Sequence, residues 1–380
     1  MQGRVNLVTG AAGFSGSHVV RELLARGERV IASDRAETLA DPRIRDTLAA
    51  TGVELTHPQL TLKPADLLDP GSLPALFEGV TRVFHTASLY DYSAPLDRLL
   101  RVNVEGTRNL IAAAARIKLE RFIHWSTCGV FGKPYTASVR GKTNVPFTED
   151  SPSPKSEPFG AEGPTGTELV NDYSIAKWRQ EQMIWRAHRE GTIPVTVVRP
   201  APIYGPGSAY GHGGIMLGIA HGILPAIPTD AKNYITTSVH VEDIAGFALH
   251  IADRADSIGE DYNVVDNSII SYYEFVQYIA LLTGRRLRDL PFVNLKRARV
   301  VMVPAARAMG WLEKRFGWRR LRVFEPQSAE YVSSSYWLSN RKSLATGYQY
   351  RYPDVREGLK DTIAWMRENG WLADRRRLFA

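Results

Sequence analysis

Residues 8–16 read VTGAAGFSG, a glycine-rich turn that decides the fold of the first half of the chain. An apolar run typical of a buried strand precedes the turn at residues 5–9. Apolar residues then recur at helical spacing through SHVVRELLARGE at residues 17–28, and the glycine near the end of this stretch predicts where the helix stops. A strand, a tight turn and a helix therefore follow one another without a gap.

The three glycines of the turn, Gly10, Gly13 and Gly16, are spaced as G-x-x-G-x-x-G. Residues without side chains let the backbone turn tightly and let a pyrophosphate approach the N–H groups at the helix start. Asp34, at the end of the next apolar run, is placed to accept hydrogen bonds from an adenosine ribose. Arg35 beside it either stacks on adenine or pairs with a 2′-phosphate. We therefore predict dinucleotide binding, with NAD as the expected cofactor and NADP as the alternative.

Strand and helix patterns alternate through the first half of the chain. Strands are predicted at RVIASD, RVFHTAS, RFIHWST and PVTVVRPAPIYG, and a helix at NVEGTRNLIAAAARI. This alternation predicts an α/β fold, a Rossmann doubly wound parallel sheet with helices on both faces and a smaller C-terminal α/β substrate-binding lobe. We expect residues 1–200 to bind NAD(P) and residues 201–380 to form mainly the substrate lobe, with residues 236–266 returning to the first domain.

The alternation fails between residues 133 and 170, a stretch rich in Pro, Gly, Ser and Thr. Loops of this length inside a compact domain are either functional lids or disordered inserts. Both interpretations stay open from the sequence.

The composition sets further bounds. The 380 residues have a formal charge of +7, and 44% of them are apolar, as in soluble globular proteins. The single cysteine, Cys128, excludes an intrachain disulfide and is expected to fill space in the core. No apolar run reaches the roughly 20 residues that a membrane span needs, so a cytoplasmic location is expected. The sequence contains neither a metal-site histidine motif nor a nucleic-acid-binding module, so we expect neither partner.

One segment is strongly basic. Twelve Lys or Arg residues stand between Arg285 and Arg322, against two acidic residues, and tryptophans are interleaved with them. A basic amphipathic stretch can lie on an anionic membrane surface, so peripheral membrane contact through residues 296–324 is one interpretation. The other is that the apolar side chains line the lobe while the arginines are solvated.

Tyr173 and Lys177, in NDYSIAKWRQE, stand one helical turn apart and so share a helix face. Hydride transfer at a carbinol needs a base for the hydroxyl proton, and a phenol with an ordinary pKa of about 10 serves better beside a cation. Ser126 and Thr127 follow a predicted strand, at the sheet edge where ligands of open α/β sheets bind. These four residues are the predicted catalytic group.

With these motifs in view, the sequence resembles the extended short-chain dehydrogenase/reductase family. The matching pieces are TGAAGFSG at Thr9, DLLD at Asp66, HTAS at His85, NVEGT at Asn103, STCGVFG at Ser126, YSIAK at Tyr173 and RPAPIYGPG at Arg199. By position, the resemblance implies that Thr127 orients the substrate, that Tyr173 is the general acid/base, and that Lys177 favours the phenolate and binds ribose. It also implies cofactor contacts for a further set of residues: Phe14, Asp66, Leu67, Thr86, Ala87, Ser88, Asn103, Pro200 and Ile203.

Within the family, the chain looks most like the 3β-hydroxysteroid dehydrogenase and sterol-4-carboxylate 3-dehydrogenase branch. Cys128 and Gly129 stand where sugar dehydratases of the family have an Asp-Glu pair, and Pro202 stands where epimerases commonly have an asparagine. The resemblance therefore implies oxidation of a secondary alcohol, or reduction of the ketone, on a hydrophobic, sterol-like or long-chain substrate. A nucleotide-sugar epimerase and a non-catalytic NAD(P)-sensing protein are the alternatives. The resemblance also implies a homodimer, formed by the helices that start near Asn103 and Tyr173.

Overall fold

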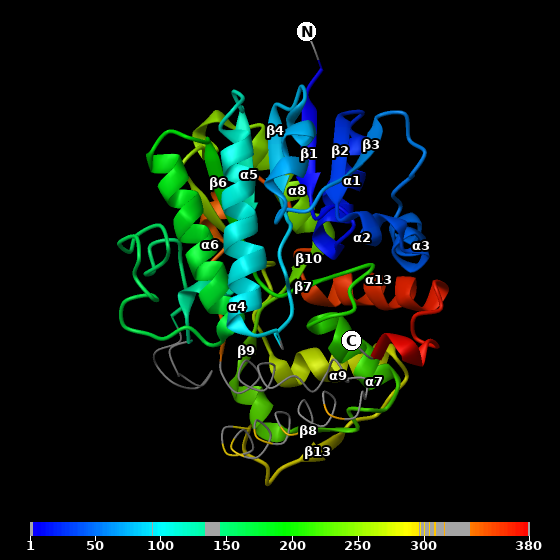
Figure 1. Cartoon of the computed structure of the whole chain (residues 1–380). Helices are drawn as coiled ribbons and strands as arrows, with labels where there is room; N and C mark the ends of the chain where they lie inside the picture. The colour runs from blue at the N-terminus through cyan, green and yellow to red at the C-terminus, as the bar shows by residue number, and fades with distance from the viewer. Residues whose placement is uncertain are drawn as a thin grey trace.

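A seven-stranded parallel sheet forms the centre of the computed structural model (Figure 1). The order of its strands is β3-β2-β1-β4-β5-β6-β11, and every neighbouring pair is parallel. The strands are β1 (Val5–Thr9), β2 (Arg29–Asp34), β3 (Leu60–Pro64), β4 (Arg82–His85), β5 (Arg121–Trp125), β6 (Val195–Pro200) and β11 (Asp261–Val264). The order reverses direction at β1, next to β4, which is where ligands of doubly wound sheets bind. The predicted α/β fold class is confirmed.

The structure describes residues 3–92, 94–133, 145–295 and 335–378, with isolated positions between 297 and 315. Part of the predicted insert and nearly all of the basic segment 296–324 therefore lie outside the described residues. No helix in the described part of the chain is long and apolar enough to cross a membrane.

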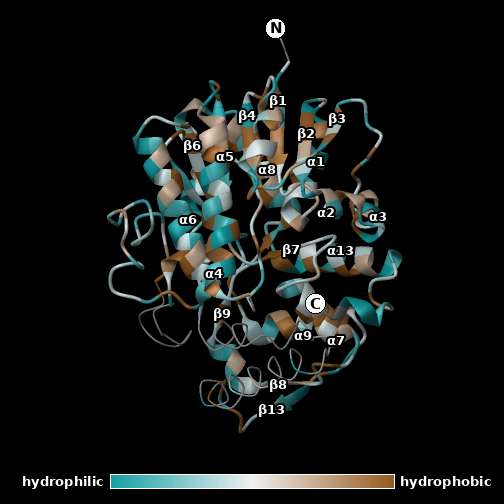
Figure 2. Ribbon diagram, viewed as in Figure 1, coloured by the Kyte–Doolittle hydropathy of each residue, from teal (hydrophilic) through white to brown (hydrophobic). Residues whose placement is uncertain are grey.

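Alternating side chains of the strands build two apolar layers, one on each face of the sheet. Val8 of β1 and Phe84 of β4 lie in one core cluster, whereas Leu7 and Val83, one residue earlier, lie in the other. The first cluster is covered by α1 (Phe14–Ala25), α3 (Pro42–Ala50) and α8 (Val241–Ala252), and the second by α5 (Gly106–Ala114) and α6 (Asp172–Arg189). Figure 2 shows this as brown strands between helices whose outer sides are teal. Successive side chains of a strand point to opposite faces of the sheet. Because these strands are apolar almost throughout, both faces are apolar and both are covered by helices.

The helix expected from Asn103 begins earlier than the sequence indicated. It starts with α4 (Leu96–Leu99), passes through a π-helical segment (Leu100–Glu105) and continues as α5. Asn103 is buried within the π-helical segment. π-Helical segments are often found at functional sites, and this one lies beside the loop that follows β4.

The C-terminal lobe has a separate apolar core under the sheet. The core is built mainly by α7 (His212–Ala220), α9 (Tyr272–Leu282) and α13 (Val355–Glu368). The other short elements are α12 (Arg341–Ala345), β7 (Ile203–Tyr204), β8 (Ala226–Pro228), β9 (Ile235–Thr236), β10 (Val239–His240), β12 (Ile270–Ser271) and β13 (Arg288–Leu290). Of these, α12 lies against β11 of the central sheet. The remaining short helix, α2 (Ala36–Ala40), follows β2.

The described part of the insert, residues 145–171, lies along the outer side of α6 (Figure 1). Trp178 donates from Nε1 to the carbonyl of Ala161 at 2.6 Å, and Gln182 donates from Nε2 to the carbonyl of Pro158 at 3.0 Å. This part of the insert therefore braces the helix that carries Tyr173.

Candidate active site

The glycine-rich turn is closed against the loop that follows β4. Gly10 has a φ of 69°, and a Cβ atom there would lie 2.7 Å from the backbone nitrogen of Ala87. A Cβ on Gly16 would lie 2.2 Å from the carbonyl oxygen of Gly10. Both positions therefore require glycine. Gly13 is the N-cap of α1 and places no side chain over the helix start, so the first N–H groups of α1 face a site that suits a pyrophosphate.

Asp34 lies beside this turn. Its carboxylate accepts hydrogen bonds from the backbone N–H of Ala12 at 3.2 Å and of Arg35 at 2.9 Å. Burial raises the pKa of Asp34, while these two hydrogen bonds oppose that rise. The Arg35 guanidinium is exposed and pairs with Glu37 at 2.9 Å. Asp34 is thus held against the glycine-rich turn, and the side chain of Arg35 is directed to α2.

The residues after β3 and β4 fix the backbone of the cradle. Thr86 donates from Oγ1 to the carbonyl of Thr9 at 2.8 Å, and Leu67 packs against Gly106. Asp66 accepts from the N–H of Leu68 at 2.9 Å. These contacts tie the end of β4 to the end of β1 and place the segment after β3 against α5.

Ser88 and Asn103 take different parts in this loop. The Ser88 hydroxyl is buried and has no hydrogen-bond partner among the described residues. Both polar atoms of the Asn103 side chain bond the backbone of Leu89. Oδ1 accepts from the Leu89 N–H at 2.6 Å, and Nδ2 donates to the Leu89 carbonyl at 3.3 Å. Asn103 therefore positions the loop, whereas Ser88 has a hydroxyl available to a ligand.

Tyr173 and Lys177 lie one turn apart on α6, whose start is capped by Asn171 through the N–H of Ser174 at 2.8 Å. Both side chains are buried, with 7% and 1% of their surface exposed. Lys177 donates from Nζ to the carbonyl of Trp125, at the end of β5, at 2.7 Å. Burial lowers the pKa of Lys177 to about 7, against the opposing attraction of Glu181. The cation is thus fixed at the sheet edge and is able to lose its proton near neutral pH.

The two predicted hydroxyl residues after β5 have different surroundings. Thr127 is partly exposed, its Oγ1 accepts from the N–H of Gly129 at 3.2 Å, and its side chain also hydrogen-bonds the Cys128 thiol. Ser126 is buried and donates to Glu181. The Cys128 thiol between them and the core has its pKa raised to about 12 by burial, which agrees with a role as core filler.

A buried ion-pair network, formed by Glu181, Arg199 and Asp261, was not predicted from the sequence. Arg199 Nη2 lies 2.6 Å from Glu181 Oε1, and Arg199 Nη1 lies 2.5 Å from Asp261 Oδ2. The three side chains are at most 2% exposed. The network ties α6 to β6 and β11, directly below the catalytic pair. Only the RP pair at the end of β6 marked Arg199 in the sequence, and nothing indicated its partners.

Aromatic side chains surround the ring of Tyr173. The rings of Tyr90 and Tyr92 meet it edge to face, with centroids at 5.1 and 5.4 Å. Tyr90 also meets Tyr210 at 5.7 Å and is 40% exposed. These residues lie in loops without periodic patterning, so no sequence signal singled them out. They form an aromatic wall (Tyr90, Tyr92, Tyr210) beside the predicted acid/base.

The segment after β6 reaches the same edge of the sheet. Ala201 donates from its N–H to the carbonyl of Val264 at 3.0 Å, and Ile203 begins β7, which pairs with β10. Pro200 ends β6 itself. The predicted nicotinamide-side residues therefore stand at the C-terminal end of the sheet, together with Thr127.

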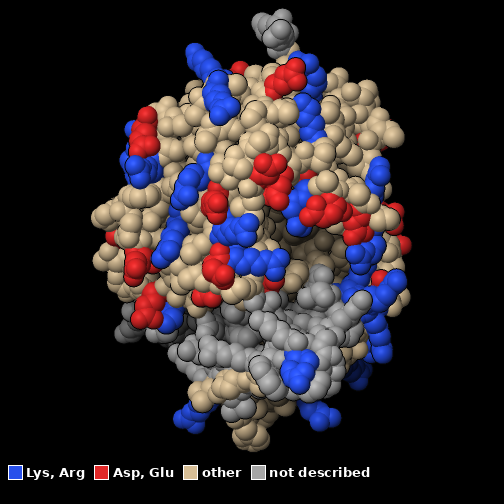
Figure 3. Space-filling model, in the orientation of Figure 1, with Lys and Arg blue, Asp and Glu red and all other residues tan. Residues whose placement is uncertain are grey.

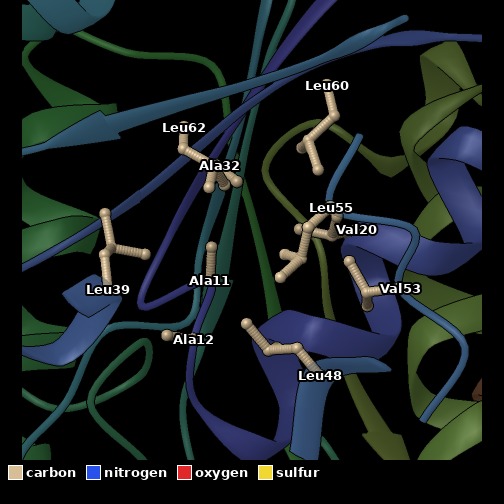
Figure 4. Close-up of a pocket in the computed structure, with 10 residues that line it drawn as sticks. All are labelled: Ala11, Ala12, Val20, Ala32, Leu39, Leu48, Val53, Leu55, Leu60 and Leu62. Atoms are coloured by element: carbon tan, nitrogen blue, oxygen red, sulfur yellow. The ribbon is translucent and has the colours of Figure 1, made fainter. Parts of the chain in front are cut away.

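A small apolar pocket near the glycine-rich turn is not part of this site. Figure 4 shows its lining, which comes from the turn, α1, β2, α2, α3 and β3. The cavity has a volume of about 10 Å³, and all ten lining side chains are apolar. A cavity of this size without polar partners does not hold an ordered water, so it is a packing gap in the core.

Comparison with known proteins supports one family. A family model described as the NAD dependent epimerase/dehydratase family matches residues 6–264. Among curated relatives, the chain is 29% identical to sterol demethylase protein B of Methylococcus capsulatus, over 96% of this chain and 99% of that protein. It is 25% identical to a 3-beta-hydroxysteroid dehydrogenase of Mycolicibacterium neoaurum, over 90% of this chain and 84% of that protein.

Solved structures agree on the fold. The crystal structure of gox2253 is 27% identical, with a TM-score of 0.71 over 96% of this chain and 98% of that one. A UDP-glucuronic acid 4-epimerase from Bacillus cereus in complex with NAD has a TM-score of 0.68 at 17% identity, over 96% of this chain and 99% of that one. At that identity the likeness concerns the fold alone.

Proposed function

The chain belongs to the NAD-dependent epimerase/dehydratase family, and we propose that it is an oxidoreductase that interconverts a secondary alcohol and a ketone on a hydrophobic substrate. The observation that carries this proposal is that Tyr173 and the buried Lys177 share one face of α6, and that Lys177 is bonded to the end of β5, the strand that Thr127 follows. The relatives named for sterol and hydroxysteroid chemistry support the substrate class.

The residues present fit a nicotinamide dinucleotide. The turn at Gly10 and Gly16 has no room for a Cβ, and Asp34 stands where an adenosine ribose diol would be bound. The Asp34 carboxylate would repel a 2′-phosphate, and Arg35 is paired with Glu37, so the site favours NAD over NADP. When bound, this cofactor takes up or supplies the hydride.

The side chains then divide the rest of the work. Thr127 donates its hydroxyl proton to the substrate oxygen and so holds the carbinol at the sheet edge. Tyr173 accepts the hydroxyl proton during oxidation and returns it during reduction. The ammonium of Lys177, one turn away, stabilises the negative charge that Tyr173 carries once deprotonated. The aromatic wall (Tyr90, Tyr92, Tyr210) offers ring faces and edges for the apolar body of the substrate.

The proposal is tested by following NADH and NADPH during incubation with sterols, 4-carboxysterols, long-chain β-hydroxy acids and nucleotide sugars. Tyr173→Phe should abolish turnover of a lipid alcohol and leave NADH binding intact. Tyr278→Phe, which removes a phenol from α9 in the lobe, is the matched control and should retain activity. Turnover of nucleotide sugars alone would overturn the substrate class. Cofactor binding without any turnover would favour a cofactor-sensing protein.

We also propose that the protein pairs through α5 and α6 as a homodimer. The exposed side chains of α5, of the π-helical segment before it and of α6 include Arg101, Glu105, Arg108 and Arg179. Figure 3 shows acidic and basic groups interspersed over this face. A two-fold interface sets such a patch against its own copy, so arginines can meet carboxylates. Light scattering should give a dimer mass, and Glu105→Arg should weaken the dimer. A monomer at every concentration would contradict this pairing.

A further inference from the structure

Five buried polar side chains form a continuous hydrogen-bond chain that ends on Lys177. Lys177 Nζ lies 2.5 Å from Gln180 Oε1, and Gln180 Nε2 lies 2.8 Å from Thr107 Oγ1. Thr107 Oγ1 lies 2.8 Å from His85 Nε2, and His85 Nδ1 lies 2.8 Å from Thr9 Oγ1. The five side chains are at most 2% exposed. We refer to this set as the hydrogen-bond chain.

Donor counting fixes the first half of the hydrogen-bond chain. An ammonium only donates, so Gln180 must present its oxygen to Lys177 and its NH₂ group to Thr107. Thr107 Oγ1 then accepts from Gln180, and because a hydroxyl oxygen has a second lone pair it either donates its own proton to His85 Nε2 or accepts a proton from it. His85 carries its proton on Nδ1 in the first case and on Nε2 in the second. Both tautomers are neutral, in agreement with burial, which lowers the pKa of His85 to about 3 with a further contribution from Lys177.

The hydrogen-bond chain joins the catalytic helix to the cofactor cradle. Thr9 and His85 are register partners at the ends of β1 and β4. Thr9 directly precedes Gly10, and His85 directly precedes Thr86, which closes the cradle on the other side. Thr107 lies on α5 and Gln180 on α6. A displacement of the glycine-rich turn would thus be transmitted to the Lys177 ammonium through four hydrogen bonds.

We propose that Gln180, Thr107 and His85 are positioning residues, which hold the Lys177 ammonium in place and tie it to Thr9 at the cofactor cradle. This inference rests on the proposed function, because it takes Lys177 as the group that stabilises the phenolate. It assigns the three residues no contact with substrate or with reacting atoms.

The charged and titratable groups around Lys177 come from α6, β4, β5 and β6. On α6 itself, Tyr173 lies one turn before it and Glu181 one turn after it, and Glu181 is paired with Arg199 of β6. His85 and His124 are the histidines of β4 and β5 at this point, paired in register, and burial lowers the pKa of both. Both histidines are therefore neutral, and a charge introduced at position 180 would be the only new one in contact with the ammonium among the described residues.

Gln180→Glu gives a sharp test, because it should leave only one direction for the hydrogen-bond chain. A carboxylate at this position only accepts, so Thr107 would donate to it and could no longer donate to His85 Nε2. His85 would then have to carry a proton on Nε2. The same carboxylate beside Lys177 should raise the midpoint of the alkaline limb of the pH–rate profile by about one to three pH units.

The tautomer is measured by nitrogen-15 NMR of the histidine rings in the full-length protein without ligand. Gln180→Glu should show His85 protonated on Nε2, whichever tautomer the wild-type protein holds. Gln182→Glu is the matched control, because Gln182 lies on the same helix and bonds the carbonyl of Pro158, outside the hydrogen-bond chain. It should leave His85 as in the wild type, and thermal unfolding checks that each variant is folded.

The outcomes separate this inference from the proposed function. A His85 ring without a proton on Nε2 in folded Gln180→Glu would overturn the inference. An unchanged midpoint of the alkaline limb in folded Gln180→Glu would overturn it as well. An Nε2–H tautomer in Gln180→Glu, together with a wild-type protein that turns over no alcohol, would leave the hydrogen-bond chain in place and refute the proposed function instead.

Discussion

Replacing Asp261 by asparagine should show how much the buried ion-pair network contributes to the free energy of unfolding. Burial by itself raises the pKa of Asp261, but the attraction of Arg199, Lys155 and Lys342 outweighs it and lowers that pKa from 3.8 to about 2. The difference of about 1.8 between the two pKa values corresponds to about 2.4 kcal/mol of folding stability at neutral pH. Asp261→Asn keeps the shape of the side chain and removes its charge, so it should lower the free energy of unfolding at pH 7 by at least this amount.

The pH dependence of this loss has a definite sign. The pKa of Asp261 is lower in the folded protein than in the unfolded chain, so its stabilisation is complete above the unfolded value of 3.8 and disappears as the pH falls through about 2. At pH 3 about half of it, about 1.3 kcal/mol, should remain. The difference between the wild-type protein and Asp261→Asn should therefore shrink on acidification.

Glu260 provides the matched control for this experiment. It is the neighbouring residue and pairs with Lys342 at 2.6 Å and Lys155 at 3.5 Å, the same two lysines, but its side chain is 39% exposed. Glu260→Gln should cost less than about 1 kcal/mol, because water screens exposed ion pairs. Urea unfolding at pH 7, 5 and 3, followed by circular dichroism, measures all three proteins. Equal losses for the two variants, or a loss for Asp261→Asn that does not change with pH, would refute this reasoning.

Three further predictions concern the site itself. Gly16→Ala should abolish NADH binding in a fluorescence titration, because its Cβ would lie 2.2 Å from the carbonyl oxygen of Gly10. Gly3→Ala is the control and should leave binding unchanged, because no atom lies within 4 Å of a Cβ at that position. Between pH 7 and 10.5 the unfolded chain holds a proton at Lys177 that the folded protein has lost. The stability of the wild-type protein relative to Lys177→Met, measured by urea unfolding, should therefore rise by about 1.4 kcal/mol per pH unit. A difference that does not change with pH would contradict the buried cation. Asp34→Ser should weaken NADH binding and relieve the repulsion of NADPH, so the ratio of the two affinities, measured by calorimetry, should move toward NADPH; an unchanged ratio would exclude Asp34 as the selecting residue.

Much of the fold could be predicted because its signals are local. The turn at residues 8–16, the strand that ends at Asp34 and the helix that carries Tyr173 and Lys177 each follow from residues close together in the sequence. The boundary at Asn103 was missed because a π-helical segment lets the helix begin at Leu96, and no periodicity marks that change.

The parts of the site that were missed depend on partners distant in the chain. Ser126 was grouped with Thr127 as a catalytic hydroxyl, but its bond to Glu181 joins residues 55 positions apart. Gln180 and Thr107 are 73 positions apart, and His85 and Thr9 are 76 apart. A polar residue on a helix is predicted to face solvent unless its partner is known, and only the assembled sheet brings these partners together. The roles of Ser126 and Thr127 in catalysis stay predictions.

Helix α6 explains why the catalytic pair and the buried ion-pair network occur together. Tyr173, Lys177 and Glu181 are spaced by four residues and so form one stripe that faces the ends of β5 and β6. An unpaired carboxylate at position 181 would hold a proton on Lys177 at all physiological pH values. Because Arg199 binds that carboxylate at 2.6 Å, its attraction for Lys177 is largely offset, and burial can bring the pKa of Lys177 down to about 7. The network therefore does more than fasten α6 to the sheet, since it leaves burial as the main influence on the pKa of Lys177.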